Sequence, residues 1–324
     1  MSPEASPEVA RLDDRTVAPL VPQRDARSHK GSHGTLVIVA GSLDHLGAAL
    51  LAAAAAIRAG AGLVSLALPA SLQPLAAGRV PEAVTMGLPE RVPMEVEPLT
   101  AAQAILDRSP DALLLGPGLR PGEATSALVL ALLREEGAPA VLDAEALNVL
   151  AAAGDWWTSV GRATVLTPHP GEFSRLDGSP VGPADDERAA RAGAAAERWG
   201  RVVVLKGAGT VIAGGAGRLA RAPFENPALA TAGTGDVLAG TVAALLAQGL
   251  AAWDAARLGV YLHGVAAERA SERLGDAGLM ASDLPLLIAR ARHDLVRAAG
   301  GGRGERRPGS TQRRLGFGER SRSA

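Results

Sequence analysis

Short apolar runs alternate along the chain with longer segments of helical periodicity. The runs are almost free of polar residues, which is typical of strands buried on both faces of a parallel sheet. Each run ends at a glycine, a proline or a polar residue before the next segment begins. The predicted strands are residues 35–40, 63–68, 112–115, 140–142, 163–166 and 202–205, and the predicted helices between them are 47–59, 124–134, 145–152 and 185–199.

The alternation changes after residue 209. Residues 210–213 and 218–221 flank a glycine-rich turn, which predicts a β-hairpin. Three helices, at 236–247, 254–274 and 282–298, follow it. Because strands that alternate with helices pack as a sheet between helical layers, we expect an α/β fold. The prediction is a three-layer α/β/α sandwich with a mainly parallel central sheet and a late antiparallel hairpin.

Both ends of the chain lack this pattern. Residues 1–28 are polar, contain prolines and show no periodicity, so we expect a flexible N-terminal lead-in with room for one short helix. Residues 300–324 are rich in glycine, arginine and serine and predict a disordered, solvated basic tail. One ordered domain, over residues 29–299, remains between them.

Composition narrows the classes of function. A formal net charge of −1 over 324 residues gives no overall attraction to nucleic acid. The chain has no cysteine, which excludes disulfides, thiolate metal sites and a cysteine nucleophile. The N-terminus has no apolar signal-peptide core, and no apolar run is long enough to predict a membrane span. We therefore expect a cytoplasmic protein with neither nucleic acid nor membrane among its partners.

Glycines and polar residues follow the predicted strands. The carboxyl ends of parallel strands meet at one edge of the sheet, where such folds bind ligands, so we expect these residues to share one site. Taken singly, each has a structural explanation, since an aspartate can cap the next helix and a lone histidine is often a loop residue. The strand-end residues are Gly41-Ser42, Gly116-Pro117-Gly118, Asp143, Thr167-Pro168-His169 and Lys206-Gly207.

The loop Gly233-Thr234-Gly235-Asp236 precedes and opens the helix predicted at 236–247. Its glycines let backbone N–H groups approach a ligand closely, and the N-terminus of a helix favours anions such as phosphate. Asp236 lies in the first helical turn, where an acid is common in any helix. Two interpretations stay open: a phosphate-handling loop with an acid, or a capped core helix.

Other catalytic motifs are missing from the sequence. It contains no G-x-x-x-x-G-K-[ST] phosphate loop, no G-x-G-x-x-G after the first strand and no G-x-S-x-G nucleophile turn. No cluster of histidines and carboxylates has the spacing of metal ligands, so we expect no structural metal site. Mg²⁺ would instead arrive with a nucleotide.

Segments spread over residues 28–298 resemble the ADP-dependent NAD(P)H-hydrate dehydratases, which are carbohydrate-kinase-like members of the ribokinase-like fold. The Thr-Pro-His-Pro-Gly-Glu motif together with Lys-Gly-x-x-Thr is more specific than Gly-Thr-Gly-Asp, which the wider sugar-kinase fold shares. The segments are KGSHG at 30–34, GA at 47–48 with IRAGAGL at 57–63, LGPG at 115–118, LDAEALN at 142–148, TPHPGE at 167–172, KGAGT at 206–210 and AGTGDVLAG at 232–240.

The resemblance implies a repair reaction. The family uses ADP to remove water from the S-epimer of hydrated NADH or NADPH, which yields NAD(P)H, AMP and phosphate, and its bacterial members prefer ADP over ATP. It also implies a homotetramer. Carried onto this sequence, it makes Asp236 the catalytic base; the substrate-binding residues are then Ala48, Gly118, His169 and Asp236, and the residues that bind ADP are Lys206, Gly207, Ala208, Gly209, Thr210 and Gly235.

The sequence departs from the family pattern in two places. Glu145 stands where the family often has aspartate, and we leave it out of the predicted site. Many family members also carry an epimerase domain before this one, whereas about 28 residues precede it here. We therefore expect epimerisation to come from a separate chain.

Three other functions fit parts of the sequence. A ribokinase-like kinase of a hydroxymethylpyrimidine or thiazole alcohol would use the same Asp236 loop, with ATP and a stable phosphorylated product. A nucleotide-sensing module would leave Asp236 idle. Nucleic-acid binding by the basic tail would be sensitive to salt.

Overall fold

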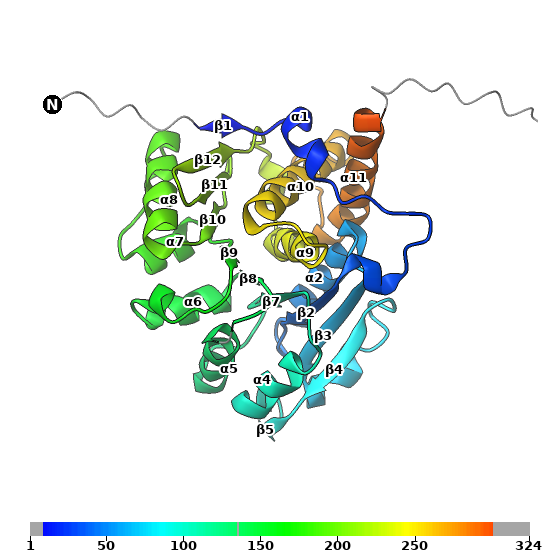
Figure 1. Cartoon of the computed structure of the whole chain (residues 1–324), viewed down its shortest axis with the longest axis vertical. Coiled ribbons are helices and arrows are strands. Elements are labelled where there is room, and N and C mark those ends of the chain that lie inside the picture. The colour runs from blue at the N-terminus through cyan, green and yellow to red at the C-terminus, as the bar shows by residue number, and fades with distance from the viewer. Residues whose placement is uncertain (1–8, 135, 301–324) are drawn as a thin grey trace, which may run out of the picture.

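The computed structural model describes residues 9–134 and 136–300. Strands of the described chain form one large twisted sheet, which Figure 1 shows with helices on both sides. The expected basic tail falls on residues 301–324, outside the described residues. In spatial order the strands are β1 (Ala10–Arg11), β12 (Arg218–Arg221), β11 (Val211–Gly214), β10 (Val202–Leu205), β9 (Thr164–Leu166), β8 (Ala140–Leu142), β7 (Ala112–Leu115), β2 (Thr35–Val39), β3 (Leu63–Pro69) and β4 (Val84–Leu88).

The pairing of the strands confirms the predicted sheet. All neighbours from β10 to β4 run parallel, while β11 is antiparallel to both β10 and β12. The late antiparallel hairpin predicted from the glycine-rich turn is therefore present. A separate small ladder joins β5 (Glu90–Val92) to β6 (Glu95–Val96).

Both faces of the sheet are buried. In β2, Leu36 and Ile38 belong to one core, while Val37 and Val39 belong to the other. Alternate residues of a strand point to opposite faces, so an unbroken apolar run is what two covered faces require. All four side chains are at most 1% exposed.

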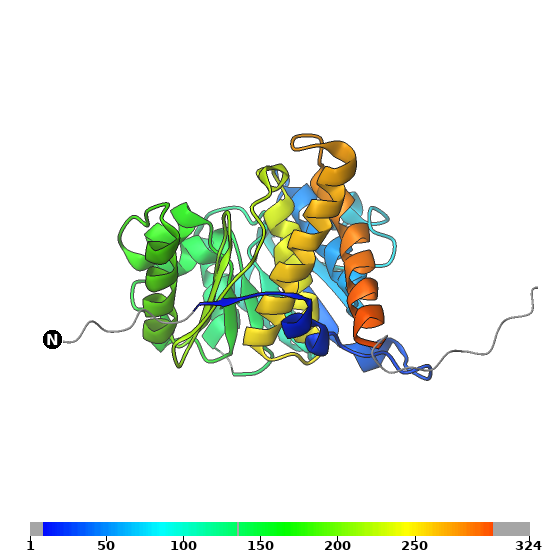
Figure 2. The same ribbon diagram turned by 90° about the horizontal axis from the view of Figure 1, so that it is seen from above.

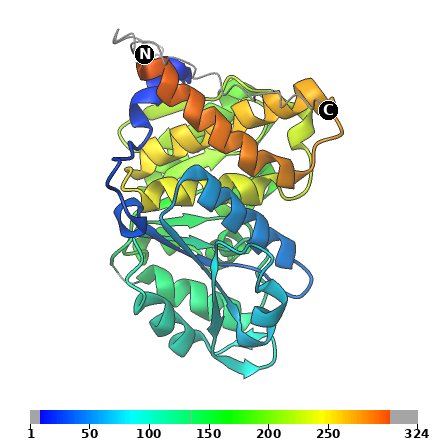
Figure 3. The same cartoon turned by 90° about the vertical axis from the view of Figure 1, so that its right-hand side faces the viewer.

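Two layers of helices cover the faces, as Figures 1 and 2 show. The helices of the first layer lie side by side in Figure 3, in blue, yellow and orange. The first layer consists of α2 (Leu46–Ala59), α9 (Thr234–Ala247), α10 (Ala252–Leu274) and α11 (Leu284–Gly300); the second consists of α4 (Pro98–Leu106), α5 (Glu123–Arg134), α6 (Glu145–Ala152), α7 (Pro170–Asp177) and α8 (Asp185–Trp199).

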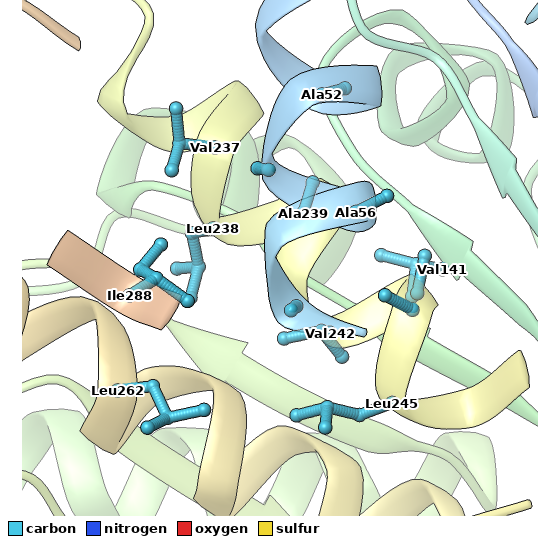
Figure 4. Close-up of a cluster of buried hydrophobic side chains, with 14 of the residues drawn as sticks. Ala52, Ala56, Val141, Val237, Leu238, Ala239, Val242, Leu245, Leu262 and Ile288 are labelled. Carbon is cyan, nitrogen blue, oxygen red and sulfur yellow. The ribbon is translucent and has the colours of Figure 1, made fainter. Parts of the chain in front are cut away.

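Small side chains bring α2 and α9 together. Ala52 and Ala56 of α2 face Val237, Ala239 and their neighbours on α9 in Figure 4. At Gly240 a Cβ atom would collide with the carbonyl oxygen of Ala52. The abundance of alanine and glycine therefore has a structural role, because it allows α9 to be buried between α2 and the sheet.

The expectation of a flexible lead-in does not hold for residues 9–21. β1 pairs in parallel with β12, and Leu12 and Val17 are buried against the helical layers. The phenol of Tyr261 in α10 donates a hydrogen bond to Asp14 at 2.8 Å. The segment is ordered by a few tertiary contacts. Its apolar residues are too sparse to show a period, which is why the sequence pattern missed it.

Some elements in the middle of the chain were also missed. β4 is an edge strand that contains glycine and methionine, so it lacks a continuous apolar run. α7 begins with proline and glycine, which look like a turn in the sequence. Proline is in fact well suited to the first turn of a helix. Within the described residues, no helix has the length and apolar character needed to cross a membrane.

Candidate active site

Three neighbouring strands deliver polar side chains to one place. Asp143 follows β8, Thr167 follows β9 and Lys206 follows β10, and the strand ends meet because the strands are parallel. The Lys206 ammonium lies 2.8 Å from Oδ1 of Asp143, which also accepts a hydrogen bond from the Thr167 hydroxyl at 2.8 Å. The predicted gathering of strand-end residues is thus found for these three.

A second carboxylate completes the surroundings of Lys206. Oε2 of Glu172 lies 3.8 Å from the Lys206 ammonium, and the lysine side chain is 19% exposed. Burial lowers the pKa of Lys206, but Asp143 and Glu172 raise it by more, so the pKa lies above its ordinary value. Lys206 therefore keeps its positive charge at the bottom of the site.

Asp236 lies in the first turn of α9, close to this charged group. Burial raises the pKa of its carboxyl to about 7, with a further rise from Asp143 and Glu172 and a counteracting effect of Lys206. A carboxyl that titrates near neutral pH can exchange a proton during a reaction. The left-handed conformation of Gly233, with φ 89°, turns the chain into the helix just before it.

A buried histidine of α10 forms a hydrogen bond to the first turn of α9. Nε2 of His263 in α10 lies 3.0 Å from the carbonyl oxygen of Thr234. Burial lowers the pKa of His263 to about 4, so the ring is neutral and donates its Nε2 proton to that carbonyl. The Thr234 hydroxyl donates in turn to the carbonyls of Leu229 and Thr231. These bonds fix the loop without occupying the N–H groups at the helix start.

His169 caps α7 and faces the same space. The ring nitrogen Nδ1 accepts hydrogen bonds from the backbone N–H groups of Gly171 at 3.0 Å and Glu172 at 3.3 Å. The backbone N–H of His169 donates to Oε2 of Glu172 at 2.8 Å. The imidazole is 51% exposed. The reciprocal cap thus orients a histidine that remains open to a ligand.

A cavity of about 820 Å³ lies beside these groups. Its size falls within the range of about 300–1,000 Å³ that is usual for ligand sites. Its lining combines Lys206 and residues at the start of α9 with apolar groups such as Phe224 and Val260. Of the residues predicted to bind, six line it: His169, Lys206, Gly207, Ala208, Thr210 and Gly235.

Four other predicted residues, Asp236, Gly209, Ala48 and Gly118, are not part of the cavity lining. Gly209 is in the loop between β10 and β11, and Ala48 and Gly118 form a separate pair. A Cβ atom on Gly118 would lie 3.0 Å from that of Ala48. Leu51, one turn further along α2 than Ala48, packs closely on Gly233. A Cβ atom on Gly233 would lie 2.6 Å from Cδ1 of Leu51. The pair therefore lies on the α2 side of the loop that carries Asp236.

Glu172 and His263 were not predicted as site residues. Glu172 was visible only as part of a motif, and its contact with Lys206 depends on the turn of α7 that was missed. His263 lies in the middle of a long amphipathic helix, where a histidine gives no signal of its own. Glu145, left out of the site, accepts a hydrogen bond from Asn148 at 2.9 Å.

The carboxylates near the cavity are not grouped as metal ligands. Across residues 9–134 and 136–300, no group of three or more histidines and carboxylates has an arrangement that could hold a metal ion. Asp143 and Glu172, the nearest acids to Lys206, both lie against its ammonium.

Comparison with known proteins places these features in a family. The model of the family described as NAD(P)H-hydrate dehydratase matches residues 36–289. The chain is 44% identical over 266 residues to the bifunctional NAD(P)H-hydrate repair enzyme of Moorella thermoacetica, which covers 82% of this chain and 50% of that protein. It is 37% identical over 256 residues to the ADP-dependent (S)-NAD(P)H-hydrate dehydratase of Xanthomonas campestris pv. campestris, covering 79% of this chain and 87% of that one.

A solved structure gives the same result. The ADP/ATP-dependent NAD(P)H-hydrate dehydratase of Bacillus subtilis, co-crystallised with ATP and Mg²⁺, matches with a TM-score of 0.77 and 33% identity, over 89% of this chain and 99% of that one. The ribokinase-like fold expected from the sequence is confirmed. The chain spans about half the length of the bifunctional relatives that it matches. The motif resemblance is also confirmed, and the chain belongs to the NAD(P)H-hydrate dehydratase family.

Proposed function

We propose that the protein removes water from the S-epimer of hydrated NADH or NADPH at the expense of ADP, giving NAD(P)H, AMP and phosphate. The observation that carries this proposal is the position of Asp236. Its carboxyl, whose pKa is about 7, lies at the positive end of α9, near Lys206 and beside a cavity of nucleotide size. Such a site brings together a base, a phosphate-binding helix end and room for a nucleotide.

The chemistry begins with transfer of the β-phosphoryl group of ADP to the hydroxyl of the hydrated nicotinamide ring. Asp236 accepts the hydroxyl proton as the oxygen attacks phosphorus, and AMP leaves. The ring nitrogen then expels phosphate, and loss of a ring proton restores the double bond. The N–H groups at the start of α9 and the Lys206 ammonium stabilise the charge on the phosphoryl group during transfer.

The remaining predicted residues divide between the two ligands. In the proposal Ala48, Gly118 and His169 contact the hydrated dinucleotide on the α2 and α7 side. ADP occupies the cavity, with its phosphates near Lys206 and its adenine toward Phe224. The residues proposed to hold ADP are Lys206, Gly207, Ala208, Gly209, Thr210 and Gly235, of which all but Gly209 line the cavity. Mg²⁺ would enter on the nucleotide phosphates.

The proposal extends to the setting of the enzyme. We place it in the cytoplasm, where reduced nicotinamide nucleotides are used, and we propose the homotetramer that the family resemblance implies. Sedimentation velocity of the purified chain tests the assembly, because a monomer or dimer at working concentration would contradict it.

The direct test is to supply hydrated NADH with ADP, or with ATP, and follow the absorbance of reduced nicotinamide. We expect recovery of NADH with stoichiometric AMP and phosphate when ADP is present. A stable phosphorylated alcohol from a hydroxymethylpyrimidine or thiazole, without recovery of NADH, would instead identify a kinase. No recovery with either nucleotide would refute the dehydratase.

A further inference from the structure

A buried arginine lies behind the loop that follows β10. Arg188, in the first turn of α8, is 5% exposed. Its guanidinium donates hydrogen bonds to three backbone carbonyls of one short stretch, those of Leu205 and Lys206, both at 3.2 Å, and of Ala208 at 2.5 Å. A planar guanidinium with several fixed donors suits such a task better than an ammonium does.

By holding these carbonyls, Arg188 also determines the direction of the N–H group in each of the same peptide units. In a trans peptide the C=O and the next N–H point in opposite directions. Because the Lys206 carbonyl is turned toward Arg188, the N–H of Gly207 is directed away from it, and Gly207 lines the cavity. The N–H of Gly209, next to the Ala208 carbonyl, reaches the carbonyl of Phe224 at 2.9 Å. One guanidinium thus sets the orientation of the whole turn.

Two glycines permit this close support. A Cβ atom on Gly207 would lie 2.8 Å from Nη2 of Arg188, and one on Gly209 would collide with the guanidinium of Arg221. Both glycines have positive φ, 144° and 56°. The loop therefore lies directly on two guanidinium groups, with no side chain between its backbone and the cations.

The two guanidinium groups behind the loop are paired with carboxylates. Asp185 lies between the two arginines, with its carboxylate 3.6 Å from Nη1 of Arg188 and 2.5 Å from Nη2 of Arg221. Arg221 has a second partner in Glu225 at 3.2 Å. Burial lowers the pKa of Arg188, while Asp185 raises it, and an arginine remains protonated at physiological pH. Arg188 therefore stays charged within this paired group, and it acts on the loop through its three charge-assisted hydrogen bonds.

We propose that Arg188 is a positioning residue for the diphosphate of the nucleotide: through its hydrogen bonds it turns the Lys206–Thr210 loop so that the N–H of Gly207 faces the cavity. This inference rests on the proposed use of ADP. Arg188 touches the loop and not the ligand, so it acts on nucleotide affinity through the backbone that it holds.

Arg201 provides a control for the loss of a partly buried arginine that also holds a backbone carbonyl. Its Nη2 donates to the carbonyl of Val160 at 2.6 Å, and burial lowers its pKa as it does for Arg188. Arg201 does not line the cavity. Arg201→Met should therefore reproduce the cost in stability of losing a buried guanidinium without any change at the nucleotide loop.

The test compares the full-length wild type with Arg188→Met, Arg188→Lys and Arg201→Met. Calorimetric titration gives the Kd for ADP, steady-state assays give KM and kcat, and thermal unfolding gives Tm. We expect Arg188→Met to raise the Kd and KM for ADP about tenfold or more, because loss of a charged donor leaves three carbonyls without their partner. The kcat should change by less than about threefold, because Asp236 and α9 are untouched. Arg201→Met should lower Tm and leave the Kd for ADP unchanged.

Arg188→Lys covers the case in which Arg188→Met does not fold. It keeps the charge but cannot span three carbonyls, so the Kd should rise by about threefold or more. A wild-type Kd in whichever Arg188 variant folds would overturn the positioning role. An equal loss of affinity in Arg201→Met would overturn it too, because the effect would then be one of general stability. Wild-type protein that binds ADP but does not dehydrate hydrated NADH would refute the proposed function alone.

Discussion

At the scale of single residues, four ionisable groups set the behaviour of the candidate site. Lys206 is held by Asp143 and lies near Glu172. Burial, with a further contribution from both acids, raises the pKa of Asp236 to about 7. A general base is most effective when its pKa is near the working pH. The arrangement therefore keeps the lysine charged and the aspartate poised between its two protonation states.

The proposed base predicts an acidic limb in the pH profile. In wild type, kcat/KM should rise with pH through about 7, because Asp236 must lose its proton to act. Glu172→Gln removes a negative charge that raises the pKa of Asp236, so the limb should move to lower pH. Gln keeps an oxygen that can accept from the N–H of His169. An unchanged limb in Glu172→Gln would show that another group is responsible.

Asp236 is also predicted to cost stability at high pH. Between about pH 4 and 7 the folded protein keeps the proton of Asp236, whereas the unfolded chain releases it. The free energy of unfolding therefore falls as pH rises through that window. Asp236→Asn should abolish turnover, largely spare ADP binding and raise Tm at pH 8 by on the order of 2 °C.

The gain should vanish below pH 4, where the aspartate is neutral in both states. Near-wild-type turnover in Asp236→Asn would contradict the assignment of the base, and a lower Tm at pH 8 would contradict the electrostatic argument.

At the scale of elements, α9 determines the geometry of the site. Its first turn carries Asp236, His263 of α10 fixes the carbonyl of Thr234, and α2 packs along its side. The contact between α2 and α9 is so close that Gly240 has no room for a Cβ atom beside the Ala52 carbonyl. The position of the helix end proposed to bind phosphate thus depends on side-chain size far along the helix.

Gly240→Ala is therefore expected to destabilise the protein, although alanine favours helix more than glycine does. The overlap with Ala52 should lower the free energy of unfolding by about 1–3 kcal/mol. Gly193→Ala in α8 is the matched control, because its Cβ would meet Leu219 at an ordinary 3.5 Å. That variant should gain about 0.5–1 kcal/mol. Chemical unfolding measures both, and a stabilised Gly240→Ala would contradict the close packing.

The regular elements could be predicted because each carries its own pattern. The strands at 112–115, 140–142 and 202–205 and the helices at 145–152 and 185–199 have the predicted bounds. The gathering of Asp143, Thr167 and Lys206 followed from parallel strands alone. Arg188 could not be found this way, because on the sequence it is one charge among several at a helix start, and its burial depends on carbonyls of a loop some twenty residues later.

At the scale of the whole molecule, the N-terminal segment is part of the domain. β1 extends the sheet beyond β12, and the chain then crosses α10, where Asp14 meets Tyr261. Tyr261 in turn packs on Phe224, with ring centroids 5.3 Å apart, and Phe224 lines the nucleotide-sized cavity. A segment expected to be a flexible lead-in is thus two contacts away from the proposed adenine end of the site.

Leu12→Ala tests the importance of this segment. Leu12 is 2% exposed, and truncation of a buried leucine costs about 2–5 kcal/mol, so Tm should fall clearly. Leu99→Ala is the control, because Leu99 is 69% exposed and its loss should leave Tm nearly unchanged. Equal Tm values for Leu12→Ala and wild type would mean that the segment contributes little to the fold.

The half-protonated carboxyl of Asp236 has a consequence for how the protein would take up its nucleotide. A diphosphate brings negative charge beside an acid whose pKa is already about 7, and this raises the pKa further. Near neutral pH, ADP and a hydrogen ion would then bind cooperatively, each increasing the affinity for the other. The heat of binding would depend on the ionisation enthalpy of the buffer, and the affinity for ADP would fall as the solution becomes alkaline.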